Sequence, residues 1–364
     1  MEIADVETYV LEVPIGREVG DSRLSITDCY WVVVEVETDS GYVGTGWMAS
    51  LGFAPDILAR FVDSQFSDLL VGRDPFATES IAADLRQQTI YYGELGVSAW
   101  PRGAIDVALW DIKAKAAGQP LYRLLGGDEP RVRAYASSMD ARHDREELAP
   151  LHEQYADQGF TAFKTKVGGR SPPAEAERVG AVRAAVGDEA DLFVDANQAW
   201  TVKETLAVAE ALEPHDVGWI EEPVSEFDEA AYGRLGGRLD TRLATGEMFY
   251  RPERFRRFLE AGGVDVAQPD LIRAGGVSGQ FEVAKLATRY GVPVANHFYY
   301  AISAHVVAAV PNGWIVEYIP EYDVASVLET PPKIEDGHVV LPDRPGHGYR
   351  VDPDARDEYE TQFD

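Results

Sequence analysis

The chain of 364 residues has a single cysteine, Cys29. One thiol excludes an intramolecular disulfide and any cysteine-rich zinc or iron–sulfur site. Cys29 begins the apolar stretch 29–34, so we expect a buried thiol that takes no part in chemistry. Disulfide-stapled and thiolate-metal proteins are thereby excluded.

Long apolar runs are also missing. No stretch of 18 or more apolar residues is present, and residues 3–10 alternate between apolar and polar instead of forming a charged segment followed by an apolar one. We therefore expect a soluble, cytoplasmic protein without a membrane partner.

Positive charge is scarce, because 33 Lys and Arg face 62 Asp and Glu, giving a formal net charge of -29. Phosphate binding needs a basic face, so a nucleic-acid partner is excluded. An apolar fraction of 45% indicates a folded chain rather than a disordered acidic one. Only seven of the basic residues are lysine. An acidic, lysine-poor surface resembles that of halophilic proteins, in which salt screens the self-repulsion. An ordinary acidic bacterial enzyme is the alternative.

From about residue 132 the chain alternates between short β-branched runs and longer helical patterns, which is typical of parallel strands joined by helices. Its length fits a barrel of about 250 residues plus a smaller domain. We predict an α/β fold containing a (β/α)8 TIM-type barrel. The predicted strands are 132–139, 160–167, 191–197, 218–223, 242–247, 265–271, 292–298 and 314–318. The predicted helices are 145–158, 173–186, 202–212, 229–239, 251–261, 277–290 and 302–309.

The residues before the barrel have a different pattern. Residues 1–48 alternate like an antiparallel meander with a hairpin turn at 38–41, and residues 55–125 appear helical up to a glycine pair. We predict an α+β capping domain at 1–127, the barrel at 128–322, and a C-terminal segment at 323–364 that returns to complete the cap.

Ionisable residues end seven consecutive predicted barrel strands. Barrel enzymes place their reacting groups at these carboxyl ends, where a charge is costly unless it is paired, solvated or bound to a metal. One such residue alone is more often a solvated loop residue or a helix cap. The whole series predicts an active site, and its members are Lys164, Lys166, Asp195, Asn197, Glu221, Glu222, Glu247, Asp270, His297 and Glu317.

Three of these carboxylates, Asp195, Glu221 and Glu247, end neighbouring strands and can converge on one point. A purely carboxylate ligand set suits a hard cation, so we expect one Mg2+, with Mn2+ as an alternative. Glu222 could replace Glu221 as a ligand. Side chains alternate along a strand, and Glu221 lies in the same layer as the other two, so Glu221 is favoured.

Lys164 and Lys166 lie two residues apart on one strand and therefore share a face. Each ammonium disfavours the charge of the other, so one can have a lowered pKa and act as a base near neutrality. The alternative is that both lysines only balance the charge of the metal-binding carboxylates.

His297 and Asp270 end adjacent strands, and a carboxylate beside an imidazole fixes its tautomer and raises its basicity. We expect His297 to be a second acid/base group. Glu317 could hydrogen-bond a substrate oxygen as the protonated acid, which would require a raised pKa. The predicted substrate-binding residues are Asn197 and, from a polar cap loop at 15–25, Arg17 and Arg23.

This order of motifs resembles the enolase superfamily, in its mandelate racemase branch, over essentially the whole chain. The resemblance rests on Lys164-Thr165-Lys166, Val194-Asp195-Ala196-Asn197, Glu221-Glu222-Pro223, Gly246-Glu247, Pro269-Asp270 with Gly275-Gly276, Asn296-His297 and Glu317, with Ile302-Ser303-Ala304-His305 similar to the racemase itself. No lysine occurs between Lys203 and Lys285, unlike branches that lactonise muconate or epimerise dipeptides. Glu247 as third ligand departs from the glucarate dehydratase branch.

The resemblance implies a common first step, in which the metal binds the substrate carboxylate, a base removes the α-proton, and Lys164 helps to stabilise the enolate. Its fate is open. The predicted cap loop at 15–25 is polar, which favours polyhydroxy acids as substrates and hence an acid-sugar dehydratase. The second predicted cap loop, at 47–53, is apolar and is compatible with a racemase or epimerase of 2-hydroxy acids. A non-catalytic acid-sugar-binding barrel and a divalent-metal aldolase are more distant alternatives. We expect a small carboxylate substrate and a homo-oligomer.

Overall fold

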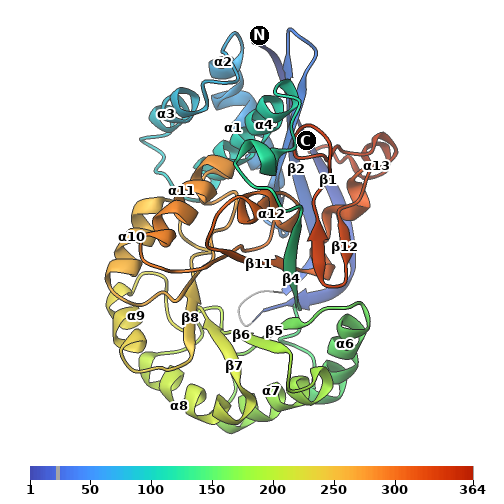
Figure 1. Ribbon diagram of the computed structural model, residues 1–364. Helices are drawn as coiled ribbons and strands as arrows, with labels where there is room; N and C mark the ends of the chain where they lie inside the picture. Colours follow the sequence, from blue (N-terminus) through green and yellow to red (C-terminus); the bar gives the residue numbers. More distant parts are fainter. Residues whose placement is uncertain (22–24, 364) are drawn as a thin grey trace.

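A computed structural model describes residues 1–21 and 25–363, with the side chain of Arg17 not described. Arg23 and the Arg17 side chain, both predicted to bind substrate, therefore lie outside the described residues. The described chain forms an antiparallel sheet with helices, a barrel, and a tail that touches both (Figure 1). None of the described helices is long and apolar enough to cross a membrane.

The N-terminal sheet is the predicted antiparallel meander. It consists of β1 (Ile3–Gly20), β2 (Ser25–Thr38) and β3 (Val43–Ser50), paired in that order. The predicted turn joins β2 to β3, where the Thr38 hydroxyl accepts a hydrogen bond from the Tyr42 backbone N–H at 3.0 Å. Gly41 has φ +79°, a conformation that favours glycine at this turn. The turn prediction is confirmed.

Helices cover one side of this sheet. They are α1 (Pro55–Gln65), α2 (Ser67–Leu70), α3 (Thr78–Gln88), the short η1 (Gly96–Ser98), α4 (Trp100–Ala116) and α5 (Leu121–Leu124). The long helix α4 packs directly on β3. A Cβ atom at Gly44 or Gly46 would lie 2.0 Å from a backbone carbonyl oxygen of α4, so glycine at both positions allows the close contact.

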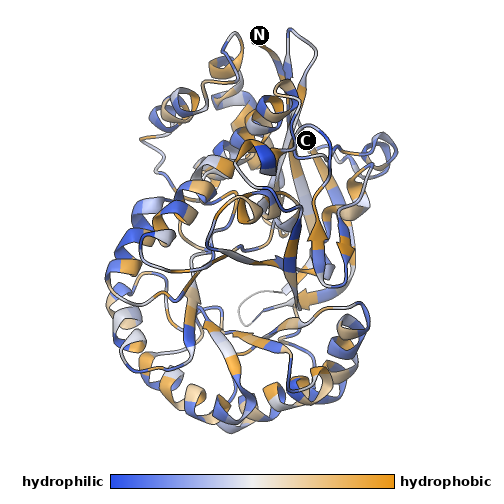
Figure 2. Ribbon diagram, viewed as in Figure 1, coloured by the Kyte–Doolittle hydropathy of each residue, from blue (hydrophilic) through white to orange (hydrophobic). Residues whose placement is uncertain are grey.

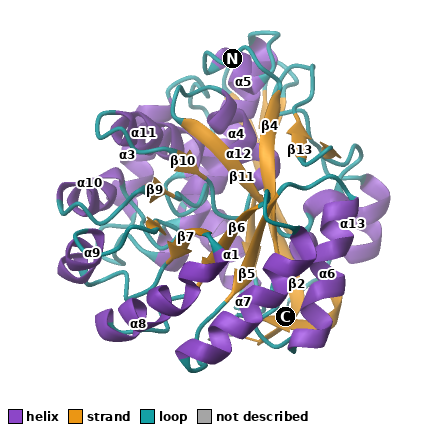
Figure 3. Cartoon of the chain, turned by 60° about the horizontal axis from the view of Figure 1, so that its bottom comes forward, coloured by secondary structure: helices purple, strands orange, loops and turns teal. Residues whose placement is uncertain are grey.

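Eight parallel strands close into the predicted barrel. In chain order they are β4 (Arg131–Ser137), β5 (Ala162–Lys166), β6 (Asp191–Asp195), β7 (Val217–Glu221), β8 (Arg242–Thr245), β9 (Val266–Ala267), β10 (Val294–Ala295) and β11 (Gly313–Tyr318). Each pairs with the next, and β11 pairs with β4 to close the ring. The helices between them form the outer layer in Figure 3. They are α6 (Arg145–Asp157), α7 (Pro172–Val186), α8 (Val202–Leu212), α9 (Glu229–Gly236), α10 (Pro252–Glu260), α11 (Gly276–Thr288) and α12 (Tyr300–Ala308), with the short η2 (Glu213–His215) after α8.

Local sequence explains where these elements begin and pack. Helices α6 and α8 start at capping boxes, formed by Asp144 with Glu147 and by Thr201 with Glu204. The barrel interior is filled by aromatic side chains, with the Phe193 and Trp219 rings stacked at 3.4 Å between centroids. Figure 2 shows hydrophobic and hydrophilic residues alternating along the outer helices, as expected for helices with one buried face.

The tail contacts both parts of the molecule. After η3 (Pro320–Tyr322) and η4 (Val324–Val327), the hairpin of β12 (Lys333–Glu335) and β13 (His338–Val340) adds to β4, on the barrel. Helix α13 (Pro353–Tyr359) lies on the cap, where Arg356 pairs with Glu7 at 2.5 Å. The return to the cap thus involves the last part of the tail, while the hairpin extends the barrel sheet.

Hydrogen bonds from the N-terminal sheet reach loops that follow the carboxyl ends of barrel strands. The Gly20 N–H donates to the Met139 carbonyl at 3.4 Å, just after β4. The Tyr299 hydroxyl, after β10, accepts a hydrogen bond from the Ala49 N–H at 2.9 Å. Residues 15–20 belong to β1 and residues 47–50 belong to β3, which corrects the prediction of cap loops at 15–25 and 47–53. Val19 pairs with Ile26 beyond a register shift, so strand pairing continues further than its polar sequence suggested.

Candidate functional site

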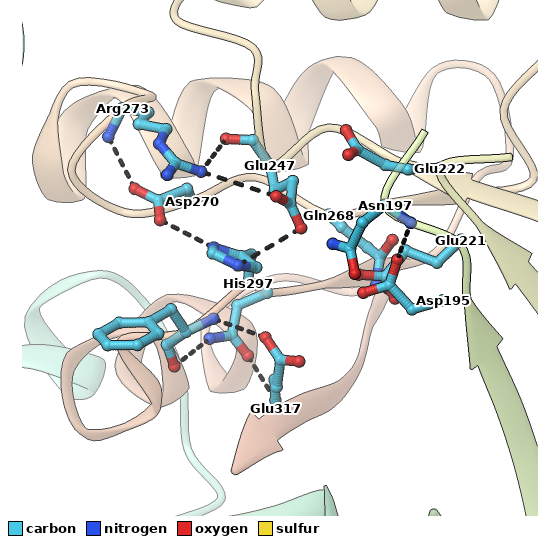
Figure 4. A network of polar contacts seen from close by, with 12 residues as sticks. Asp195, Asn197, Glu221, Glu222, Glu247, Gln268, Asp270, Arg273, His297 and Glu317 are labelled. Atoms are coloured by element: carbon cyan, nitrogen blue, oxygen red, sulfur yellow. Dashed lines mark hydrogen bonds and ion pairs between the residues drawn. The ribbon is translucent and has the colours of Figure 1, made fainter. Parts of the chain in front are cut away.

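Three buried carboxylates gather at the carboxyl ends of neighbouring strands. Asp195 ends β6, Glu221 ends β7, and Glu247 follows β8. One oxygen from each lies within 4.8 Å of the others, and the three side chains are labelled in Figure 4. Glu222, the alternative ligand, is not in this cluster. It has φ +37° and accepts a hydrogen bond from the Gln198 amide at 2.8 Å.

Glu221 is held by several donors. The Trp219 indole N–H and the Gln268 amide donate to its Oε2 at 3.2 and 2.8 Å. Burial and the neighbouring carboxylates Asp195 and Glu247 raise the pKa of Glu221 to about 7, although Lys164 opposes the shift. The cluster therefore carries negative charge at a cost, which a cation would reduce.

Both lysines of β5 point at this cluster and are buried. The Lys164 ammonium lies 2.8 Å from a Glu221 oxygen and 2.6 Å from Glu317, while the Lys166 ammonium lies 2.5 Å from Asp195. Burial favours the neutral amines, but the facing carboxylates outweigh it and raise the pKa of each lysine above its ordinary value. The expected lowered lysine pKa is therefore not found here, because acidic neighbours outweigh the repulsion between the two ammonium groups.

His297, just after β10, contacts two carboxylates. Its Nδ1 lies 2.9 Å from Asp270 Oδ2, and its Nε2 lies 3.4 Å from Glu247 Oε2 (Figure 4). Burial lowers the pKa of His297, but Glu247 and Asp270 outweigh it and raise the value to about 8. The Asp270 carboxylate also accepts hydrogen bonds from the backbone N–H groups of Ile272 and Arg273, so it is fixed in place.

Glu317 differs from the expectation of a protonated acid. Burial alone would raise its pKa, but Lys164 and His297 outweigh burial and lower the pKa to about 2. The ionised carboxylate accepts a hydrogen bond from the Phe298 N–H at 2.8 Å. The sequence showed that Glu317 ends a strand but not that an ammonium faces it.

Asn197 is buried beside the cluster, with φ +44° and its backbone N–H donating to Asp195 at 2.8 Å. Its side-chain oxygen is buried without a hydrogen-bond partner among the described residues. A buried acceptor that lacks a partner is costly, so a bound group that donates to it would stabilise the site.

Sequence reasoning missed several residues that contact the site. Gln268 lies two residues before Asp270, so strand alternation could have placed both on one face. Arg273 lies three residues beyond Asp270 and was not predicted from the sequence. Its guanidinium donates to the Glu247 carbonyl at 3.1 Å. Asp140, just after β4, makes the eighth strand end ionisable, but the predicted strand stopped at Met139.

The cluster fits a divalent cation on the chemistry of its donors. Three buried carboxylates without sulfur or imidazole, each with an oxygen within 4.8 Å of the others, are the ligand type that Mg2+ prefers. Fold and cluster together define a TIM-type barrel protein with a candidate divalent-cation site at the carboxyl ends of its strands.

Comparison with known proteins assigns the family. The model for the mandelate racemase / muconate lactonizing enzyme N-terminal domain matches residues 5–126, and the model described as enolase C-terminal domain-like matches residues 147–355. The chain is an enzyme of the enolase superfamily and belongs to its mandelate racemase/muconate lactonizing enzyme subgroup. The predicted family and fold are confirmed.

Relatives with assigned activities differ in reaction. The arabinonate dehydratase of Saccharolobus solfataricus is 31% identical over 339 residues, covering 91% of each chain. The 3,6-anhydro-alpha-L-galactonate cycloisomerase of Streptomyces coelicolor is 30% identical, over 96% of this chain and 97% of the relative.

Solved structures agree over nearly the full length. A racemase from Streptomyces coelicolor A3(2) with bound magnesium has a TM-score of 0.95 at 30% identity and covers 99% of this chain and 100% of its own. L-Talarate dehydratase from Polaromonas sp. JS666, complexed with Mg and L-glucarate, has a TM-score of 0.92 at 28% identity, over 99% and 98% of the two chains.

Proposed function

We propose that this enzyme removes the α-proton of an acid sugar in a Mg2+-dependent reaction and then expels a β-hydroxyl, as a sugar acid dehydratase. One observation carries the proposal. Two candidate bases touch the candidate cation site at different ligands, since Lys166 contacts Asp195 and His297 contacts Glu247. A carboxylate bound at this cluster therefore lies within reach of both.

Asp195, Glu221 and Glu247 would hold the cation. When bound, Mg2+ supplies positive charge that fixes the substrate carboxylate and offsets the negative charge that grows as the α-proton leaves. Asp195 raises the pKa of Lys166. If Asp195 also held a cation, it would raise that pKa less, and Lys166 would then be a better base.

The other side chains have distinct proposed roles. Lys164 is buried among carboxylates and stays protonated, so its ammonium can donate to a substrate oxygen that becomes negative. Asp270 holds Nδ1 of His297, which leaves Nε2 to take or give a proton. The imidazolium can protonate the leaving β-hydroxyl, while ionised Glu317 keeps Lys164 charged and in place.

Dehydration is supported by the arabinonate dehydratase and L-talarate dehydratase relatives. The unpartnered oxygen of Asn197 also suits the hydroxyl groups of a polyhydroxy acid. Neither identifies the particular acid.

A racemase or cycloisomerase is the second candidate, and the wall beside His297 favours it. The Phe298 ring lies 5.9 Å from that of Trp31, between centroids, and an aromatic wall suits a less polar substrate. The racemase and the cycloisomerase from Streptomyces coelicolor support the same candidate.

A screen of C5 and C6 aldonic and aldaric acids in D2O tests the proposal. Each reaction is followed by NMR for α-deuteration and for loss of water, with Mg2+ and with excess EDTA. We expect one or more acids to form a dehydrated 2-keto product with Mg2+ only. Deuteration without water loss would favour the second candidate, and turnover undiminished by EDTA would contradict metal dependence.

A further inference from the structure

A buried polar cluster beneath Lys166 fixes the backbone of that residue. Asp140 lies after β4 and is 0% exposed, and Arg178 lies on α7 and is 4% exposed. The Asp140 Oδ1 accepts a hydrogen bond from the Lys166 backbone N–H at 2.9 Å, and the Arg178 Nε donates to the Lys166 carbonyl at 3.1 Å. Both backbone polar groups of Lys166 are thus held by side chains.

The two holding side chains are themselves paired. The Arg178 guanidinium lies 3.0 Å from Asp140 Oδ1 and also donates to the backbone carbonyls of Asp140 and His143. The other Asp140 oxygen accepts from the Thr165 hydroxyl at 2.9 Å and contacts His152 Nε2 at 3.2 Å. Both carboxylate oxygens of Asp140 and all three guanidinium nitrogens of Arg178 are hydrogen-bonded, so this buried pair restricts where β5 ends.

The cap contacts the loop after β4, which carries Asp140. Gly20 of β1 bonds to Met139, and Glu18 pairs with Arg142 at 2.5 Å, so both contacts flank Asp140. A displacement of this cap segment therefore acts directly on the loop that supplies Asp140.

We propose that Asp140 and Arg178 are positioning residues for Lys166, which set the place of its ammonium relative to the substrate α-carbon. This inference rests on the proposed function, because it assumes that Lys166 acts as a base. A misplacement of about 1 Å can reduce a rate about 100-fold, so small backbone shifts at Lys166 matter. His297 follows β10, across the barrel, and is held by Asp270 rather than by this pair.

The test variant is Arg178→Lys, which keeps a cation beside buried Asp140 but removes the forked guanidinium. The matched control is Arg183→Lys on the same helix. Arg183 is also buried and donates to the carbonyls of His215, Gly187, Ala190 and Asp216, which precede β6 and β7 at the opposite end of the barrel. Both variants lose comparable hydrogen bonds, but only one loses contacts to Lys166.

The readout is α-proton exchange in D2O for the two C2 epimers of the most active acid in the screen described above. We expect Arg178→Lys to slow exchange about 100-fold for the epimer that depends on Lys166, as identified with Lys166→Ala, and less than threefold for the epimer that depends on His297. Arg183→Lys should change the exchange of both epimers less than threefold. Equal losses for both epimers in Arg178→Lys, or the same pattern in Arg183→Lys, would overturn the proposal.

A second measurement needs no substrate. Amide hydrogen exchange of the peptide covering 163–168 should become at least about tenfold faster in Arg178→Lys and stay unchanged in Arg183→Lys. Unchanged protection in Arg178→Lys would also overturn the inference. If the wild-type enzyme exchanged no acid in the panel but the amide result held, the proposed function would fail while the backbone restraint stood.

Discussion

At the residue scale, three buried carboxylates from neighbouring strands meet at one point at the carboxyl ends of the barrel strands. Asp195, Glu221 and Glu247 follow buried strand patterns in register, so their convergence follows from the geometry of parallel strands. The protonation states of Lys164, which is charged, and of Glu317, which is ionised, were not predictable. They depend on which charges face each other across the barrel mouth. Sequence spacing shows a shared face but not the opposing partners.

A pair of neighbouring variants tests the cation site. Glu221→Gln removes one of three charged ligands and should weaken Mg2+ binding about 100-fold or more, judging from the 10–100-fold effects of groups one layer further out. Isothermal titration with MgCl2 measures the affinity directly.

Glu222→Gln is the control at the adjacent position. Burial and the charge of Glu247 raise the pKa of Glu222 well above its ordinary value, and a Gln oxygen can accept the same hydrogen bond from Gln198, so the amide replaces Glu222 with little change. We expect less than a tenfold effect on Mg2+ affinity. Equal effects of both substitutions would contradict the assignment of Glu221 over Glu222.

At the element scale, the order of the barrel strands and helices was predicted correctly, because hydrophobic runs and helical periodicity alternate clearly along the chain. The predicted strands 265–271 and 292–298 were too long, since β9 and β10 have 2 residues each. The segment 15–20 was not, since its polar residues conceal the pairing of β1 with β2. The division of the tail between barrel and cap was also hidden. The short strand β13 is defined by its partner β4, which lies about 200 residues earlier in the chain, and among the described strands β12 pairs only with β13.

The two cap segments near the barrel mouth are expected to select the substrate. Gly20 and Ala49 contact the loops after β4 and β10, so the described part of segment 15–25 and the segment 47–53 lie beside the barrel mouth. Replacing both segments with those of the arabinonate dehydratase relative should change which acids are dehydrated while Mg2+ affinity stays within a factor of about three. An unchanged substrate profile after the exchange would place selectivity inside the barrel.

The contact between α4 and the loop after β9 should tolerate no added atom. A Cβ atom at Gly103 would lie 2.4 Å from the Ile272 carbonyl oxygen and 2.9 Å from its Cα, both backbone atoms. We expect Gly103→Ala to lower the free energy of unfolding by about 1–3 kcal/mol, measured by urea denaturation. Gly237→Ala is the control, because its nearest neighbour would be 3.7 Å away. A stable Gly103→Ala variant would contradict this packing.

At the scale of the whole molecule, the net charge of -29 implies strong self-repulsion in the folded state. Screening shortens the Debye length from about 10 Å at 0.1 M to about 3 Å at 1 M salt. We expect the thermal unfolding midpoint to rise between 0.1 and 2 M KCl, and to rise equally in NaCl. A constant or falling midpoint would contradict halophilic adaptation. The predicted homo-oligomer and cytoplasmic location stay predictions.

Two bases are proposed to act on one substrate from opposite sides, and this arrangement can be tested by α-proton exchange in single variants. Strands β5 and β10 lie three steps apart around the ring, so Lys166 and His297 approach from different sides. Each acid/base group contributes about 10²–10⁴-fold. We predict that His297→Asn abolishes net turnover yet retains D2O exchange for the epimer facing Lys166, and that Lys166→Ala retains exchange only for the opposite epimer. If both variants lose exchange, or both keep it, for every isomer tested, a single base removes the proton and the assignment of Lys166 and His297 as two bases is wrong.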